Sequence, residues 1–145
     1  MLGIFISTVL IGWGPKGYDV TFRKNGIGVR VEQVRPRSAP DENDRWGTDG
    51  DTVPLIVRRI TVIVDGRTCT TFRSAYADLS NVNRVHAYRK NGNIIVTMEG
   101  GDADASYDAV LVYRNRYLKT RRVASGEFPR EHNERTVYTS LPPEE

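Results

Sequence analysis

One acidic segment of the chain carries oxygen ligands at alternate positions. Its members are Asp102, Asp104, Ser106 and Asp108. Carboxylates spaced in this way along a loop can converge on Ca²⁺, a hard cation that takes about six to eight oxygen ligands. The segment departs from the EF-hand pattern, because Tyr107 and Tyr113 stand where that pattern needs glycine and glutamate. A calcium site and a plain acidic hairpin loop both fit these residues, and the plain loop is favoured.

Catalytic chemistry has little support in the sequence. Neither a Gly-x-Ser-x-Gly motif nor a glycine-rich phosphate loop is present. The single cysteine, Cys69, lies in a run that predicts a strand, where a cysteine usually acts as a small buried hydrophobic residue. With only His86 and His132 beside it, the chain has too few soft ligands for a Cys/His zinc site. We therefore expect a non-enzymatic protein, with Ca²⁺ the one cofactor that its residues suggest.

Basic residues gather late in the chain, with two tyrosines between them. They are Arg114, Arg116, Lys119, Arg121 and Arg122, interleaved with Tyr113 and Tyr117. On a twisted ribbon this pattern can bind single-stranded nucleic acid or another anionic partner. It is also typical of a charged ribbon edge that discourages pairing with other strands, and we favour this second interpretation. The net charge of only +3, from 21 basic and 18 acidic residues, is modest for a dedicated nucleic-acid binder.

The first thirteen residues form an apolar segment. As a helix, the stretch 2–13 would cover about 18 Å, which is too short for a hydrocarbon core of about 30 Å. The segment also lacks the basic start and the small-residue cleavage site of a signal peptide. Its many β-branched residues favour a buried strand that adds to a sheet or inserts into a partner. A membrane-associated or targeting segment remains the alternative.

Turn signals define the elements that position these residues. Asn25-Gly26, Asp65-Gly66 and Asn91-Gly92 each supply the positive φ angles of a two-residue type I′ turn. Each lies between runs of β-branched and aromatic residues, so the sequence predicts three antiparallel hairpins, over 19–32, 55–72 and 85–98.

The remaining segments complete an all-β expectation. Residues 35–54 predict a long charged loop around Trp46, and 107–113 a central strand that leads to a strand over 117–123. Residues 74–79 suggest at most one short helical turn. The polar C-terminal strap, 124–145, is expected to pack Phe128 and Tyr138 on the sheet and to end with a strand at 137–139. Nine to eleven short strands in a single domain of 145 residues predict a hairpin-rich sandwich or a strongly bent barrel.

These observations favour an interaction or structural module, a subunit or accessory component of a larger assembly. We expect a protein partner or self-association, with residues 1–13 also able to meet a membrane surface. The candidate partner-binding residues are Ile4, Phe5, Ile6, Trp13, Trp46, Arg114, Arg116, Arg121 and Arg122. The alternatives are an extracytoplasmic ligand- or calcium-binding domain and a nucleic-acid-binding domain that uses the ribbon 114–122. A location in the cell envelope, at a membrane or within a large assembly is slightly favoured.

Overall fold

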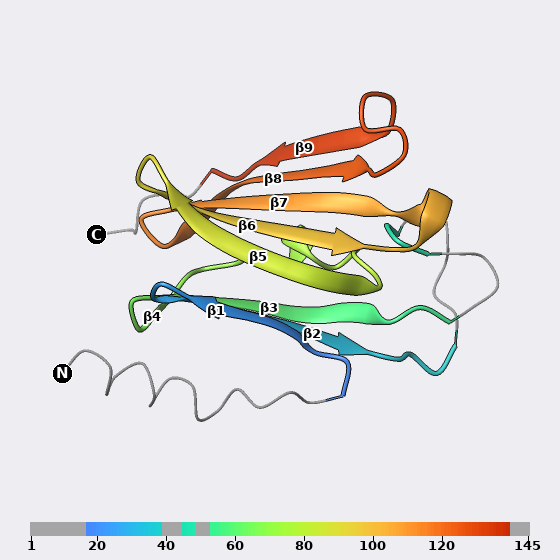
Figure 1. The fold of residues 1–145 in the computed structure, drawn as a ribbon, viewed down its shortest axis with the longest axis horizontal. Helices are drawn as coiled ribbons and strands as arrows, with labels where there is room; N and C mark the ends of the chain where they lie inside the picture. Colours follow the sequence, from blue (N-terminus) through green and yellow to red (C-terminus); the bar gives the residue numbers. More distant parts are fainter. Residues whose placement is uncertain (1–16, 39–44, 49–52, 140–145) are drawn as a thin grey trace.

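The chain folds as a sandwich of two antiparallel β-sheets (Figure 1). The computed structural model describes residues 17–38, 45–48 and 53–139, and this part holds nine strands and no closed barrel. Of the two architectures that the sequence predicts, the sandwich is confirmed. The apolar segment 1–13 and parts of the loop 35–54 lie outside the described residues. No helix in the described ranges is long and apolar enough to span a membrane.

The first sheet contains four strands in chain order. They are β1 (Val20–Lys24), β2 (Ile27–Val34), β3 (Ile56–Val64) and β4 (Arg67–Thr68). The turns at Asn25-Gly26 and Asp65-Gly66 have positive φ at both residues, as a type I′ turn requires. The second hairpin returns for only two residues, although the sequence predicts a strand to 72. Beyond β4 the chain crosses to the other sheet, where the amide of Thr70 donates to the carbonyl of Arg116 at 2.7 Å.

The second sheet is a five-stranded meander. Its strands are β5 (Val82–Lys90), β6 (Asn93–Gly100), β7 (Tyr107–Arg114), β8 (Tyr117–Ser125) and β9 (Asn133–Val137). The third predicted hairpin is confirmed as β5 and β6, and the predicted central strand is β7, third of the five. Single 3₁₀ turns, η2 (Arg73–Ala75) and η3 (Ala103–Ala105), supply the helical content of the described part.

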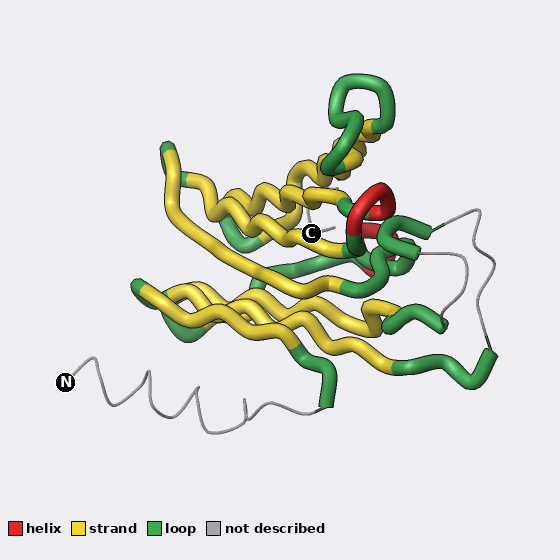
Figure 2. The backbone as a smooth tube through the Cα atoms, turned by 45° about the vertical axis from the view of Figure 1, so that its right-hand side comes forward, coloured by secondary structure: helices red, strands yellow, loops and turns green. Residues whose placement is uncertain are grey.

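The expected final strand at 137–139 is wrong. The observed strand β9 begins four residues earlier, and all of its residues are exposed. The first four residues of β9 are polar. The strand therefore lacks the alternation of apolar and polar side chains that predicts a strand from a sequence. Its pairing with β8 instead continues the backbone ladder that starts where the amide of Ser125 donates to the carbonyl of His132 at 2.8 Å. The connecting loop 126–132 projects beyond the two sheets (Figure 2).

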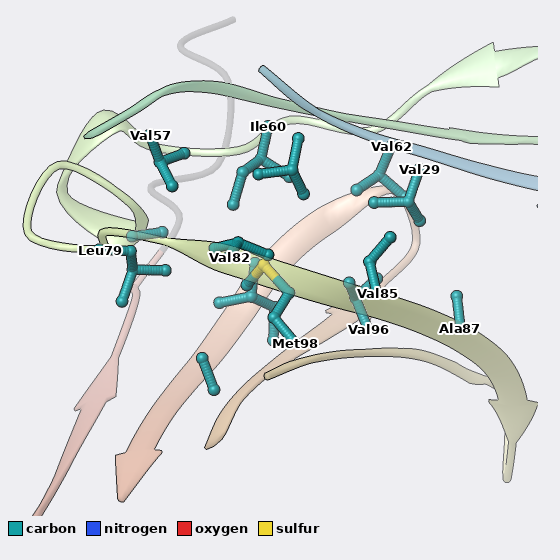
Figure 3. Close-up of a cluster of buried hydrophobic side chains, with 14 of the residues drawn as sticks. Val29, Val57, Ile60, Val62, Leu79, Val82, Val85, Ala87, Val96 and Met98 are labelled. Carbon is teal, nitrogen blue, oxygen red and sulfur yellow. The ribbon is translucent and has the colours of Figure 1, made fainter. Parts of the chain in front are cut away.

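The core lies between the two sheets and consists mainly of small branched side chains. Val29 and Val62 of the first sheet face Val85, Ala87 and Val96 of the second (Figure 3). Val29, Val62 and Val96 have no exposed surface, and each such burial contributes about 1.5–3 kcal/mol. The alternation of buried and exposed residues along the strands therefore follows from one apolar face on each sheet.

One buried side chain connects the two sheets at the side where β1 and β5 lie together. The amide nitrogen of Gln33 on β2 donates to the carbonyl of Val82 at 2.9 Å, and its oxygen accepts from the Val82 amide at 2.8 Å. The same nitrogen also donates to the carbonyl of Tyr18 at 3.0 Å. A buried glutamine is thus fully bonded, and it ties the start of β5 to the first sheet.

A fourth type I′-like turn joins β7 and β8 without a glycine. Asn115 and Arg116 have φ of 49° and 67°, a region in which non-glycine residues are strained. We expect Arg116→Gly to raise the free energy of unfolding by about 0.5–1 kcal/mol. The matched control is Gly92→Arg, since Gly92 has φ of 79° and open space around it. It should lower stability by a similar amount in urea denaturation, and equal stability of both variants with the parent chain would contradict this account of the turn.

Candidate interaction surface

The acidic segment does not form the cluster that the calcium-site alternative requires. Asp102 and Asp104 are exposed around η3, whereas Asp108 lies on β7. No group of three or more His, Cys, Asp or Glu side chains in the described ranges is arranged to hold a metal ion. The structure therefore does not bring the predicted calcium ligands Asp102, Asp104, Ser106 and Asp108 together in one site.

The basic cluster divides between two faces of the sheet. Arg114, Arg116 and Arg122 are exposed, but the Arg121 side chain is only 5% exposed. The prediction that Arg121 binds a partner is therefore wrong. Residues alternate between the faces of a strand, and β8 turns Arg121 toward the core side, where it is bonded within the chain.

Arg121 joins three parts of the chain. Its Nη1 donates to the carbonyl of Ser74 at 2.9 Å, and its Nη2 lies 2.8 Å from the carboxylate of Asp78 and 2.7 Å from that of Glu134. One guanidinium on β8 thus holds both β9 and the connector that follows β4. A charge buried to this degree is stable only because its partners compensate for its lost hydration.

The aromatic candidates have mixed outcomes. Trp46, a candidate partner-binding residue, is partly buried and packs against the core, with its ring 6.1 Å from that of Tyr107. Tyr138 packs as predicted, stacked at 5.2 Å on Phe72. Phe128 is 50% exposed, so its predicted packing is wrong, because it sits in the projecting loop beyond the sheets. The candidates Ile4, Phe5, Ile6 and Trp13 lie outside the described residues.

A surface that sequence reasoning missed lies on the side of the five-stranded sheet away from the core. We call it the outer face. One cross-strand row runs over all five strands, with each member directly opposite the next; it consists of Tyr88, Ile95, Val112, Thr120 and Val137. Tyr88 is 40% and Val137 62% exposed, so this face presents an apolar row to its surroundings.

Charges of the same sign stand opposite each other beside this row. Glu99 on β6 pairs with Asp108 on β7, and Arg122 on β8 pairs with Arg135 on β9. Like charges directly opposite on a sheet are destabilising. Burial, and then the charge of Glu99, raise the pKa of the Asp108 carboxyl above its ordinary value. Within the described ranges, Asp108, Arg122 and Arg135 form no ion pair; Glu99 lies 3.5 Å from Arg84.

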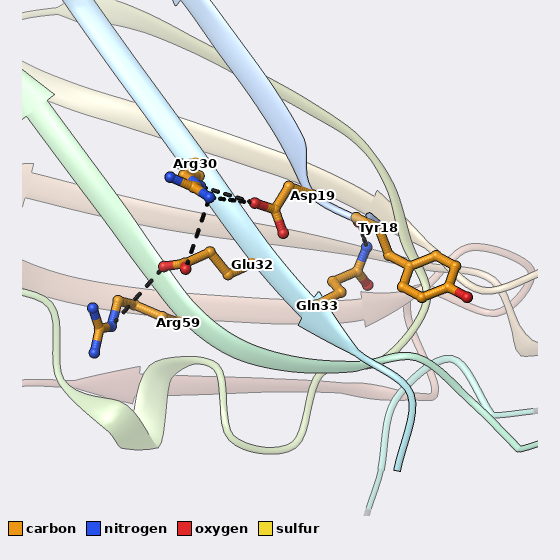
Figure 4. A network of polar contacts seen from close by, with 6 residues as sticks. All are labelled: Tyr18, Asp19, Arg30, Glu32, Gln33 and Arg59. Carbon is orange, nitrogen blue, oxygen red and sulfur yellow. Dashed lines mark hydrogen bonds and ion pairs between the residues drawn. The ribbon is translucent and has the colours of Figure 1, made fainter. Parts of the chain in front are cut away.

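The four-stranded sheet pairs its acidic residues with arginines (Figure 4). On its solvent side, Glu32 stands opposite Arg59 across β2 and β3, with 4.0 Å between the charged atoms. Arg30 donates to one carboxylate oxygen of Asp19 from Nε at 2.9 Å and from Nη2 at 2.7 Å. Asp19 and Glu32 thus each have an arginine partner, whereas the outer face places two like-charge pairs directly opposite each other.

The acidic pair lines a shallow hollow of about 550 Å³ over β5, β6 and β7. Arg84, His86, Thr97 and Val110 complete the part of its wall that faces outward. The hollow is open and mostly formed by strands, so it suits a side chain from another molecule better than an enclosed small ligand. Arg84 already pairs with Glu99 there, but Asp108 has no ion pair among the described residues, so its carboxylate would attract a further cationic group.

Comparison with protein-family models, with curated proteins and with solved structures finds no match for this chain.

We expect Arg121→Met to lower the free energy of unfolding by about 2–3 kcal/mol, because it leaves Asp78 and Glu134 without their cation. The value lies at the low end for a broken buried ion pair, since these carboxylates are 31% and 43% exposed. The control, Arg114→Met, removes an exposed arginine of the same cluster and should change stability by less than about 0.5 kcal/mol. Urea denaturation measures both values, and similar losses in the two variants would contradict the assigned role of Arg121.

Cys69 should react slowly with thiol reagents in the folded protein. It is buried, and this burial raises the pKa of its thiol even though Arg116 acts in the opposite direction. The reactive thiolate is therefore scarce at neutral pH. We expect alkylation by iodoacetamide to be about 100-fold slower or more in native protein than in protein unfolded by guanidinium, because reaction requires opening of the fold. Equal rates would show that the thiol is accessible.

Proposed function

We propose that this chain is a non-enzymatic protein-interaction module that docks a partner on its outer face. The observation that carries this proposal is the placement of two like-charge pairs beside an apolar row on one exposed face. Placing like charges directly opposite each other does not stabilise the sheet, because each such pair costs free energy. A docked partner of complementary charge would remove that cost.

The composition of the outer face agrees with this proposal. Interfaces are enriched in aromatic residues and arginine, and they place apolar side chains inside a polar rim. Here Tyr88 and Val137 stand at the two ends of the apolar row, and Arg122 and Arg135 lie directly beside it. Large exposed apolar patches on soluble domains commonly mark interaction sites.

The edge strand β9 offers a second element of the same surface (Figure 1). The amide of Tyr138 donates to the carbonyl of Lys119 at 2.8 Å, and the carbonyl of His132 accepts from Ser125 at 2.8 Å. In an antiparallel ladder these bonds alternate, so the backbone groups of Arg135 and Val137 point away from β8. No described strand lies beyond β9, and an extended segment of a partner could pair there.

A photo-crosslinking residue at Val112 tests the proposal. Val112 lies in the middle of the outer face, whereas Thr61, the control, lies on the solvent side of the four-stranded sheet. In the cells that make this protein, we expect the Val112 variant to yield a protein adduct of defined mass and the Thr61 variant to yield none. Equal adducts from both positions, or an adduct only with nucleic acid, would reject a protein-docking role for this face.

A further inference from the structure

We infer that the partner on the outer face is a second copy of this chain, an inference that rests on the proposed function. The outer face carries both signs of charge, in two separate pairs. The acidic pair is Glu99 with Asp108 on β6 and β7, and the basic pair is Arg122 with Arg135 on β8 and β9. A surface that needs a basic and an acidic partner at once is complementary to itself.

The sheet geometry permits this arrangement. Val110 links the two pairs, since it follows Asp108 by two residues on β7 and stands opposite Arg122 on β8. With strands about 4.8 Å apart and a two-residue step of about 6.6 Å, the pairs are separated by roughly 12 Å on the same face. A two-fold axis that lies parallel to the face, midway between them, places each acidic pair over the basic pair of the other copy. The same patch on both subunits is the requirement for a closed dimer.

The shapes of the two regions also correspond. The acidic pair lies in the hollow over β5, β6 and β7, whereas the basic pair lies on the ribbon of β8 and β9, where every residue of β9 is exposed. In the dimer, the arginines of one copy enter the hollow of the other and supply a cation to Asp108, which has no ion pair among the described residues and stands beside Glu99, itself 3.5 Å from Arg84. The raised pKa of Asp108 is consistent with a carboxylate that is poorly compensated in a single chain.

The face is large enough for a stable contact. Five strands about 4.8 Å apart and about eight residues long cover roughly 24 Å by 26 Å, or about 600 Å² in projection. Standard interfaces bury about 800 Å² of accessible surface on each partner, and accessible area exceeds projected area. The apolar row lies beside the two charged pairs, two residues from the basic pair and four from the acidic pair along the strands, so docking also removes Ile95 and Val112 from water next to the charged contacts.

Charge reversal tests self-docking directly. Sedimentation velocity and native mass spectrometry should show a dimer of the full chain that weakens as salt is added. The all-acidic variant is Arg122→Glu with Arg135→Glu, and the all-basic variant is Glu99→Lys with Asp108→Lys. Each should dimerise at least about tenfold more weakly, because like charges then meet across the interface. An equimolar mixture of the two variants should recover a heterodimer.

Two further variants separate self-docking from loss of fold or from net charge. Exchanging both pairs together, in one chain with all four substitutions, keeps the face self-complementary and should restore the homodimer. The matched control is Lys24→Glu with Arg67→Glu, which changes the net charge equally on exposed residues of the first sheet and should dimerise as the parent does. Thermal melts of all variants establish that each one is folded.

The inference is overturned if the parent chain is a monomer at all concentrations, or if a dimer is indifferent to both charge reversals. It is also overturned if the two variants fail to associate when mixed. The Val112 crosslink separates this result from failure of the proposed function: an adduct with a different protein keeps the docking role and rejects self-docking. Salt-sensitive binding of a single-stranded oligonucleotide that the all-acidic variant loses, with no dimer, assigns the face to nucleic acid and rejects both.

Discussion

The buried guanidinium of Arg121 determines which side chains of β8 lie on the outer face of the five-stranded sheet. It bonds the connector through Ser74 and Asp78 and the edge strand through Glu134, so β8 cannot shift along its neighbours without stranding a buried charge. Adjacent residues of a strand lie on opposite faces, and the inward position of Arg121 therefore turns Arg122 outward. A slip of one residue would exchange the two arginines and move every side chain of β8 to the other face. The outer face thus depends on an interaction made on the core side.

Both sheets pair opposite charges, but among the described strands only the five-stranded sheet also places like charges directly opposite each other. On the four-stranded sheet, Glu32 stands opposite Arg59, and Arg30 holds Asp19 by two hydrogen bonds. On the five-stranded sheet, Glu99 stands opposite Arg84 on one side and Asp108 on the other, and Arg122 stands opposite Arg135. Local rules that a structure obeys in one place and breaks in another are expected to break at functional sites, where a partner restores the balance.

The sequence predicts the parts of this fold that depend on short-range chemistry. Asn25-Gly26 and Asn91-Gly92 encode their turns locally, and the apolar alternation around them places the core residues correctly. The bounds of the last strand escape such reasoning, because the polar strand β9 has no apolar face and so does not carry the usual signal. The alternation does imply that Arg121 and Arg122 face opposite ways. Which of them is buried depends on Asp78, which lies 43 residues earlier, and a local pattern contains no such information.

The outer face could not be predicted from the sequence for a related reason. Glu99 and Asp108 are neighbours only because the segment between β6 and β7 sets a register in which they stand opposite each other. A two-residue turn fixes register by its own geometry, whereas a longer connection leaves it to the packing of the whole sheet. Arg122 and Arg135 meet across an even longer loop. A surface assembled from single residues on five strands leaves no contiguous motif, which is the ordinary way in which sites are built on a common architecture.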